Sequence, residues 1–349
     1  MTKIAVLFTC FNRIEKTRAC IDFVECAAKS AGVAIEWFIT DGGSSDGTVS
    51  ALSKHNCNDN NSTASSITPV NDSVVKSNIT PANDSVVKDK IHFQVEDGVF
   101  YSQGMRKCME MLDASESSGS FDYIMLVNDD VEFFEDFLVK MLDYSAKIGP
   151  NKVIVGATCA CPTADQDKVI VGATCACPNT EQNENCDMRT KSMSDSGITG
   201  NRIQSYGGVR YKCKPGSSLS IKYSMVSIDD SDKSCDTFNA NCVLIPWKIY
   251  SSSPRFDEHF IHGLGDFDYG LSLKGEKISS DFYVGICDNN SKAGTWMDAT
   301  LPVSERLSKL NSIKGAPTKQ WFYYLRKHFG IAPALIHSMS PYIRILLGK

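Results

Sequence analysis

Apolar and polar positions alternate in two distinct patterns near the start of the chain. Residues 3–9 and 35–40 are short apolar runs rich in β-branched and aromatic side chains, which is typical of buried strands. Between them, over 14–28, apolar residues recur at the spacing of an amphipathic helix. A glycine-rich loop at 41–48 follows the second run, and its polar residues can cap a further helix. This order predicts a parallel sheet with helices on both faces.

The same patterns return further along the chain. Short apolar runs at 91–95, 123–127 and 153–158 predict three more strands. A helical spacing of apolar residues lies between the first two of these runs, over 105–112. The alternation of strands and helices predicts an α/β fold class. The aromatic, basic and apolar residues near the C-terminus predict a helical tail.

Two stretches are tandem duplications. Residues 67–76 recur with one change at 79–88, inside a polar segment at about 56–90. Such a composition buries little apolar surface, so we expect a surface insertion there. Residues 152–162 recur at 168–178, and the second copy is predicted to be an edge strand or a loop. The duplicated Cys-Ala-Cys motifs could suggest a zinc site, but duplication alone explains them and no histidine is near.

Composition narrows the classes of function. The chain has 349 residues, a net charge of −5 and a pI of about 5.7, so it lacks the basic character expected of a nucleic-acid-binding protein. No apolar run reaches the roughly 18 residues of a membrane-spanning helix, and the N-terminus lacks the basic region of a signal peptide. We therefore expect a cytoplasmic protein, and we expect its 14 cysteines to be reduced thiols.

Asn128, Asp129 and Asp130 carry the strongest chemical signal. They directly follow the apolar run at 123–127, and acidic residues at the carboxyl end of a strand lie where open α/β sheets bind ligands. Two adjacent carboxylates repel each other unless a cation or a donor compensates them. A divalent cation that also binds phosphate oxygens would do so. A strand-end acidic pair can also be a plain helix cap.

Five segments in the chain, taken in order, resemble signatures of family 2 glycosyltransferases of the GT-A fold, in particular bacterial members that build surface polysaccharides. They lie at 9–13, 41–48, 128–130 and 256–269, and at 294–296 followed by Arg306 and Lys314-Gly315. Each motif alone is weak, whereas five in the right order are specific for the family. The resemblance implies a mostly parallel, Rossmann-like mixed sheet flanked by helices.

The resemblance also divides the chain into three parts. Residues 1–156 would form the nucleotide-sugar-binding lobe. Residues 157–295 would form the acceptor and catalytic lobe, with the duplicated insertion at about 159–182. Residues 296–349 would form the C-terminal helical tail.

The donor site implied by the resemblance begins at the first two strand ends. Asp41 would accept a hydrogen bond from the base of the nucleotide, and Arg13 would reach a phosphate. Thr9 and Asn12 would wall the nucleotide pocket. Each of these residues also has a plainer structural interpretation, because residues at strand ends commonly close turns or cap helices.

The same resemblance predicts a divalent metal, Mn²⁺ or Mg²⁺, bound at the diphosphate. Asp130 would be its firmest ligand, and His262 could be a second ligand or a plain loop histidine. Asn128 replaces the first acid of the usual Asp-X-Asp, where its amide would bind ribose or the donor sugar. Asp129 would point to the donor sugar or into a cap.

Asp266 is the candidate general base of an inverting transfer, which needs one carboxylate to take the proton of the acceptor hydroxyl. Asp268 is the alternative base. Both carboxylates could instead be present because negative charge is favourable near the N-terminus of a helix. The glutamate common before this acid in the family is Gly265 here. Gln103 and Gly104 would line the nucleoside and sugar pocket, and Trp296 would belong to the acceptor side.

The predicted activity is the transfer of a sugar from a UDP- or dTDP-sugar to a glycan or lipid-linked acceptor, with no role for nucleic acid. The tail could pack on the catalytic core, or it could contact the inner face of the plasma membrane through its aromatic and basic residues. Two rival functions stay open. One is a nucleotidyltransferase, although a basic glycine-rich loop is missing after the first strand. The other is a non-catalytic relative that binds nucleotide sugars.

Overall fold

The computed structural model describes residues 1–56, 90–160, 203–212, 219, 221–273, 277–287 and 295–348. The repeats at 67–88, the second copy at 168–178 and most of the polar segment at about 56–90 lie outside the described residues. Predictions about them therefore stay predictions.

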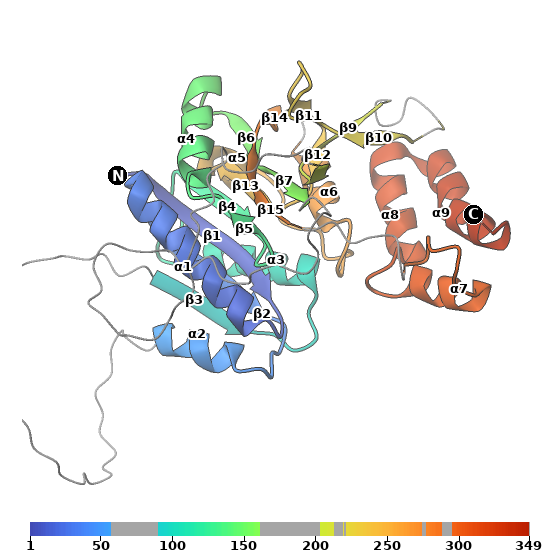
Figure 1. The fold of residues 1–349 in the computed structure, drawn as a ribbon, viewed down its shortest axis with the longest axis horizontal. Helices are drawn as coiled ribbons and strands as arrows, with labels where there is room; N and C mark the ends of the chain where they lie inside the picture. The colour runs from blue at the N-terminus through green and yellow to red at the C-terminus, as the bar shows by residue number, and fades with distance from the viewer. Residues whose placement is uncertain are drawn as a thin grey trace, which may run out of the picture.

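An eight-stranded sheet forms the centre of the molecule (Figure 1). Its strands, from one edge to the other, are β11 (Ser234–Cys235), β14 (Lys277–Ser279), β6 (Lys152–Val155), β13 (Cys242–Pro246), β4 (Tyr123–Val127), β1 (Lys3–Cys10), β2 (Ala34–Asp41) and β3 (Lys90–Val95). The strands from β4 to β3 pair in parallel, and β6 pairs in parallel with β14. Strand β13 runs antiparallel to both of its neighbours.

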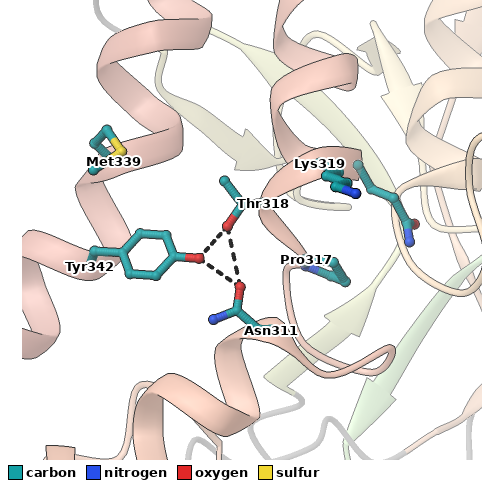
Figure 2. A pocket seen from close by; sticks show the side chains of 7 residues that line it. Asn311, Pro317, Thr318, Lys319, Met339 and Tyr342 are labelled. Atoms are coloured by element: carbon teal, nitrogen blue, oxygen red, sulfur yellow. Dashed lines mark hydrogen bonds between the residues drawn. The ribbon is translucent and has the colours of Figure 1, made fainter.

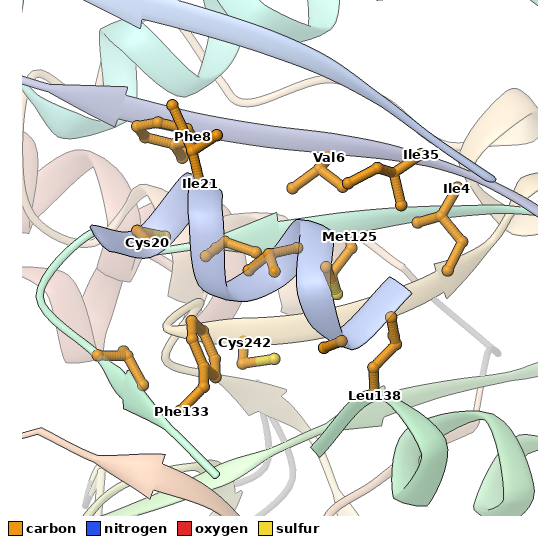
Figure 3. Packing of buried hydrophobic residues seen from close by; sticks show 14 of the residues in the cluster. Ile4, Val6, Phe8, Cys20, Ile21, Ile35, Met125, Phe133, Leu138 and Cys242 are labelled. Carbon is orange, nitrogen blue, oxygen red and sulfur yellow. The ribbon is translucent and has the colours of Figure 1, made fainter. Parts of the chain in front are cut away.

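The central strands are apolar on both faces, and the alternation of side chains divides them between two cores. Ile4, Val6 and Phe8 of β1 join one core, whereas Ala5 and Leu7 join the other. Figure 3 shows the first core, in which Cys20 and Ile21 of a helix pack against strand residues such as Met125 and Cys242. Continuous apolar runs are the pattern expected of strands covered on both sides.

Helices cover both faces of this sheet. The first core is completed by α1 (Ile14–Ala31) and α4 (Phe137–Ile148), and the second by α3 (Tyr101–Ala114), α5 (Trp247–Ser252) and α6 (Gly265–Ser272). Helix α2 (Thr48–Asn56) lies next to β3. The predicted α/β class, with a mostly parallel sheet between helices, is confirmed.

Two small sheets extend the central one. The first contains β5 (Glu132–Phe133), β15 (Tyr283–Ile286), β7 (Ala157–Ala160) and β8 (Ile203–Tyr206). The second contains β10 (Tyr223–Met225), β9 (Gly208–Tyr211) and β12 (Thr237–Phe238).

The strand predicted at 153–158 is divided at Gly156 into β6 and β7, which belong to different sheets. A side chain at Gly156 would not fit, because its Cβ would lie 2.4 Å from Cγ1 of Val284.

The C-terminal tail is helical, as predicted, and consists of α7 (Val303–Asn311), α8 (Thr318–Phe329) and α9 (Ile331–Leu346). Helix α8 lies between α9 and the rest of the molecule (Figure 1). It packs against the rest of the molecule through Tyr324, Leu325 and Phe329, which share a buried cluster with Tyr211 and Phe260. Within the described residues, no helix is long and apolar enough to cross a membrane.

The central sheet takes strands from both sides of residue 156, so the division into lobes stays a prediction. Seven cysteines of the described part are free thiols, and six of them are buried. Cys26 is disulfide-bonded, so the expectation of reduced thiols is wrong at that position.

Candidate active site

The predicted donor residues meet at the carboxyl ends of three neighbouring strands. Strand β1 pairs in parallel with β2 and with β4, and Cys10 is in register with Asp41. The loops that follow these strands therefore emerge at the same edge of the sheet, where open α/β sheets bind ligands.

Asn12 joins the first two of these loops. Its side-chain oxygen accepts a hydrogen bond from the Ser45 backbone N–H at 2.8 Å, and its own N–H donates to Ser44 Oγ at 2.7 Å. Asn12 adopts a positive φ of 51°, a conformation that asparagine tolerates better than most residues. Asp46 then accepts a bond from the N–H of Ile14, the first residue of α1. The two loops thus form one rigid wall.

Asp41 is fully buried and its carboxylate faces its own loop. One oxygen accepts from the N–H groups of Gly43 and Ser44, and the other accepts from Ser44 Oγ and Cys10 Sγ. A nucleotide base could bind this carboxylate only by replacing one of those four donors. The four bonds show that Asp41 shapes its own loop, and its contact with a nucleotide base stays a prediction.

Thr9 and Gly104 lie in direct contact, because a Cβ on Gly104 would lie 2.5 Å from Cγ2 of Thr9. The glycine allows α3 to approach β1 closely. One residue earlier, Gln103 donates its backbone N–H to the carbonyl of Ile261 at 3.3 Å. The start of α3 therefore connects the donor edge with the segment that leads into α6.

The two acids of the triplet differ in exposure. The side chain of Asp129 is 2% exposed, and its oxygens accept from Arg13 Nη1 at 3.0 Å and from Thr17 Oγ1 at 3.1 Å. Burial raises the pKa of the Asp129 carboxyl, and the nearby Arg13 opposes that rise. The side chain of Asp130 is 32% exposed and lies 3.5 Å from Arg13. Asp130 is therefore the carboxylate that can meet a ligand.

Asn128 has a specific partner. Its side-chain nitrogen donates to Asn241 Oδ1 at 3.2 Å, which an aspartate at this position could not do. Asn241 also approaches Cys287 Sγ, at 3.7 Å, and that sulfur lies 3.8 Å from Asp130 Oδ1. Asn241 and Cys287 were not singled out from the sequence, because they come from distant segments and no local pattern distinguishes them.

His262 is the other predicted metal ligand. Its Nδ1 is buried and has no hydrogen-bond partner in the described part of the chain. Burial lowers the pKa of the imidazole, and the positive charges of Lys314 and Arg13 lower it further. The ring is therefore neutral near pH 7, the state in which a histidine nitrogen binds a metal.

A neutral imidazole with an unused nitrogen and the outward-facing Asp130 fit a divalent cation chemically. Within the described residues, no group of three or more His, Cys, Asp or Glu side chains surrounds a common point. A cation at this edge would therefore need further ligands that are not His, Cys, Asp or Glu side chains of the described residues.

Tyr101 is the first residue of α3, and its ring contacts that of Phe256. Its hydroxyl is buried without a hydrogen-bond partner in the described part of the chain. Burial raises its pKa, and the charges of Asp266 and Asp130 raise it further, so both acids lie within electrostatic range of this phenol. Sequence reasoning missed Tyr101, although it stands two residues before the predicted Gln103.

Close packing explains why a glycine stands at position 265. A Cβ there would lie 2.3 Å from Ser102 Oγ, a hydroxyl that donates to the His262 carbonyl. A glutamate at this position would have to displace the start of α3. Leu264, the residue before, adopts a positive φ of 68°, which marks a tight entry into α6.

Asp266 and Asp268 stand in contrasting surroundings. Asp266 is partly buried, and its bonds within the described residues come from backbone N–H groups alone, those of Phe267 at 2.9 Å and Ala240 at 3.3 Å. Burial raises the pKa of its carboxyl to about 6. Asp268 is 1% exposed and is paired with Lys327 at 2.8 Å and His328 at 2.7 Å. Asp266 thus keeps a free carboxylate face, whereas Asp268 joins α6 to α8.

Asp266 opens into a pocket of about 290 Å³. The lining residues are Tyr211, Tyr223, Asn239, Gly263, Leu264, Asp266, Phe267, Trp321 and Tyr324. Aromatic faces beside one carboxylate and one amide suit a sugar ring, which has both apolar faces and hydroxyl edges. Trp321 and Tyr324 come from the aromatic tail segment noted in the sequence, but their place in this pocket depends on how α8 packs.

Trp296 lies in the tail and is partly buried, and its backbone carbonyl accepts a bond from Arg306 Nε at 2.8 Å. It does not line the Asp266 pocket. A larger cleft of about 570 Å³ also lies in the tail, and Figure 2 shows the bonded group of Asn311, Thr318 and Tyr342 inside it. No carboxylate lines that cleft, so the pocket at Asp266 is the candidate active site.

No protein-family model matches the chain, and no curated protein matches it. Among solved structures, residues 1–349 of TarS from S. aureus are similar in fold, with 11% identity, 99% of this chain and 81% of that chain covered, and a TM-score of 0.41. The mannosyltransferase PcManGT from Pyrobaculum calidifontis, in complex with GDP-Man and Mn²⁺, has 10% identity, 99% and 73% coverage, and a TM-score of 0.46. Both likenesses are too distant to bear on the chemistry, which rests on the geometry of this chain.

Proposed function

We propose that the protein is an inverting glycosyltransferase of the GT-A type, related to family 2, that moves a sugar from a nucleoside diphosphate sugar to a hydroxyl. The observation that carries this proposal is the partly buried Asp266 in an aromatic pocket, with a pKa raised to about 6. A carboxylate with that pKa is still ionised at neutral pH and is a stronger base than an ordinary aspartate.

The acceptor hydroxyl would bind with its proton directed at Asp266. Its oxygen attacks the anomeric carbon of the donor sugar while the bond from that carbon to the diphosphate breaks. The electron pair leaves with the diphosphate oxygen, and the proton passes to Asp266. A single displacement of this kind inverts the configuration at the anomeric carbon.

The donor would bind at the edge formed by the loops after β1, β2 and β4. Arg13 is 47% exposed and carries its positive charge beside Asp130, which suits a diphosphate. Asn12 and Asp41 would hold the wall of the nucleotide pocket, with Thr9 and Gly104 behind it. Gln103 and Asn128 would reach the nucleoside and sugar, and Asp129 would fix the position of Arg13.

A divalent cation, Mn²⁺ or Mg²⁺, would be held by Asp130 and His262. When bound, such a cation neutralises the charge that develops on the departing diphosphate. The neutral imidazole of His262, with its unused nitrogen, is the observation in favour of this pair.

The acceptor would be a glycan or a lipid-linked sugar in surface polysaccharide synthesis, with UDP- or dTDP-sugar as donor and Trp296 on the acceptor side. The enzyme would act in the cytoplasm, at the inner face of the plasma membrane, and its tail would contact that membrane. The aromatic walls of the Asp266 pocket support a sugar acceptor, because the apolar face of a sugar ring packs well on such side chains.

A screen of nucleotide sugars, with and without Mn²⁺, tests the proposal. We expect one donor to raise the melting temperature and, with a glycan extract as acceptor, to release nucleoside diphosphate. Release of pyrophosphate instead would identify a nucleotidyltransferase. Donor binding without any release, unchanged by Asp266→Asn, would identify a binding protein.

A further inference from the structure

The outermost helix of the tail exposes an unusually apolar surface. Six large side chains of α9 and the residue after it are more than half exposed, namely Ile331, Leu335, Ile336, Met339, Ile343 and Leu346, and Leu347 follows at 66%. At 100° per residue these positions share an arc of about 160°. No acidic residue occurs in α9. An apolar face of this size is unusual on a protein surface that meets only water.

The opposite side of α9 already has its partners. Pro333, Ala334, Ser338 and Ile345 are buried, and the helix packs against α7 and α8. The exposed arc therefore points away from the molecule, as expected from the outer place of α9 (Figure 1).

The charge around this arc indicates what covers it. Residues 301–349 contain eight lysines and arginines and one acidic residue, although the whole chain has a net charge of −5. Lys314, Lys319, Arg326 and Arg344 are exposed, and none of them has an ion pair within the described residues. Two such basic tails would repel each other, which disfavours a second copy of this chain as the partner. An anionic lipid surface attracts them.

The length of α9 determines how it could meet a bilayer. Its 16 residues extend about 24 Å, less than the roughly 30 Å of a hydrocarbon core. A helix with one apolar face and basic surroundings lies in the plane of the interface instead.

We propose that the exposed arc of α9 docks in the plane of an anionic membrane, with Lys319 and Arg344 against the lipid headgroups. The cleft shown in Figure 2 adjoins this face, because Met339 of the arc and Lys319 both line it. Helix α8 connects the docked helix to the active site, since its Trp321 and Tyr324 line the Asp266 pocket. Docking would therefore hold the acceptor pocket near the membrane surface. This inference rests on the membrane contact proposed above and is independent of the transfer reaction.

Co-sedimentation of the full chain with vesicles tests it, in the absence of any donor. We expect binding to vesicles of equimolar phosphatidylcholine and phosphatidylglycerol, and much weaker binding to phosphatidylcholine alone. The double variant Leu335→Ser, Leu346→Ser should bind about a hundredfold more weakly, roughly tenfold for each exposed leucine. The matched control is Val139→Ser on α4, which is 37% exposed and far from the tail in sequence, and it should bind like the wild type.

A second pair of variants tests the charges. Lys319→Glu with Arg344→Glu should weaken binding to the anionic vesicles by about tenfold or more and should make the residual binding insensitive to salt. Both side chains are exposed, so the double variant should fold, and a melting temperature equal to that of the wild type verifies this.

Wild-type protein that stays in the supernatant with both kinds of vesicle overturns the proposal, as does a double leucine variant that binds like Val139→Ser. A dimer in light scattering that becomes monomeric in the leucine variant, without vesicle binding, would show that a second copy covers the face. Because catalysis is not measured, failure of the transfer reaction would leave this result intact.

Discussion

The proposed donor edge and the proposed acceptor pocket use carboxylates in opposite ways. At the donor edge, Asp41 accepts four hydrogen bonds and Asp129 is buried against Arg13 and Thr17, so both acids stabilise loops. In the proposed acceptor pocket, Asp266 accepts two backbone bonds within the described residues, and burial raises its pKa to about 6. Burial also raises the pKa of Asp129, but there Arg13 and Thr17 oppose the rise. A carboxylate that is saturated with donors is a poor base, whereas one that is desolvated and underbonded keeps its affinity for a proton. The contrast separates the acids that build the site from the acid that we propose to react.

The largest expected effect is on the rate of transfer. Asp266→Asn nearly preserves the shape of the side chain but cannot take a proton, so transfer should fall by a factor on the order of 10²–10⁴ while donor affinity persists. Steady-state kinetics and calorimetric donor binding measure the two quantities separately. A wild-type rate in Asp266→Asn together with an inactive Asp268→Asn would move the base to Asp268.

The second effect is on stability. Asp268→Asn leaves Lys327 and His328 without their shared carboxylate, and we expect a loss of about 2–3 kcal/mol in the free energy of unfolding. This figure is at the lower end for a buried pair, because Lys327 is 31% exposed and also pairs with Asp257. Urea unfolding measures the loss, with Asp257→Asn, whose side chain is 16% exposed, as the milder control. Equal losses in the two variants would remove the special role of Asp268 in joining α6 to α8.

The third effect concerns the metal. Asp130→Ala removes the outward carboxylate, so we expect metal affinity and metal-assisted donor binding to fall by about 10–100-fold. Asp129→Ala should instead lower the melting temperature, because that acid is buried in the fold. Calorimetry with Mn²⁺ and donor compares the two variants. Full activity of the wild type in saturating chelator would rule out the cation.

The smallest effect is a pH-dependent gain in stability. Folding raises the pKa of Asp266 to about 6, so the folded state favours the protonated form and loses stability as the pH rises from about 4 through 6. Asp266→Asn removes this cost, so above pH 6 the variant should be more stable than the wild type by about 1–2 kcal/mol. This is less than the roughly 3 kcal/mol that the full rise in pKa implies, because the side chain is partly exposed. At pH 4 the two proteins should unfold at similar denaturant concentrations. A variant that is less stable at pH 8 would show that Asp266 is a structural acid.

Local sequence patterns were sufficient to predict much of the fold. The apolar runs that predicted strands at 3–9, 35–40 and 123–127 correspond to β1, β2 and β4, because a continuous apolar run can be satisfied only by burial on both faces. Strand-end polar residues then had to meet at one edge, since neighbouring parallel strands end together. The polar loops that contain Asn12 and Asp46 were therefore predictable as neighbours, and they are bonded to each other through Ser44 and Ser45 and through Ile14.

Other features depended on contacts between distant segments. The run at 153–158 reads as one strand, yet Val284 from another part of the chain occupies the space beside Gly156 and the chain changes sheets there. The sequence could not separate Asp266 from Asp268, because two residues in one helix turn have the same local pattern. They differ only in what packs around them, which for Asp268 is Lys327 and His328 of α8.

The sequence by itself determined the layered α/β fold, the edge of the sheet at which the predicted donor residues gather, and the short segment that holds the candidate base. Only the tertiary structure decided which acid keeps a free face, that Asp41 is used by its own loop, and that Tyr211, Tyr223, Trp321 and Tyr324 wall one pocket. Secondary structure follows from periodicities of two and 3.6 residues, which involve only residues that are close in sequence. The pKa and exposure of a side chain in the folded protein depend on desolvation and on partners that are far away in sequence. They are therefore set only when the chain has packed.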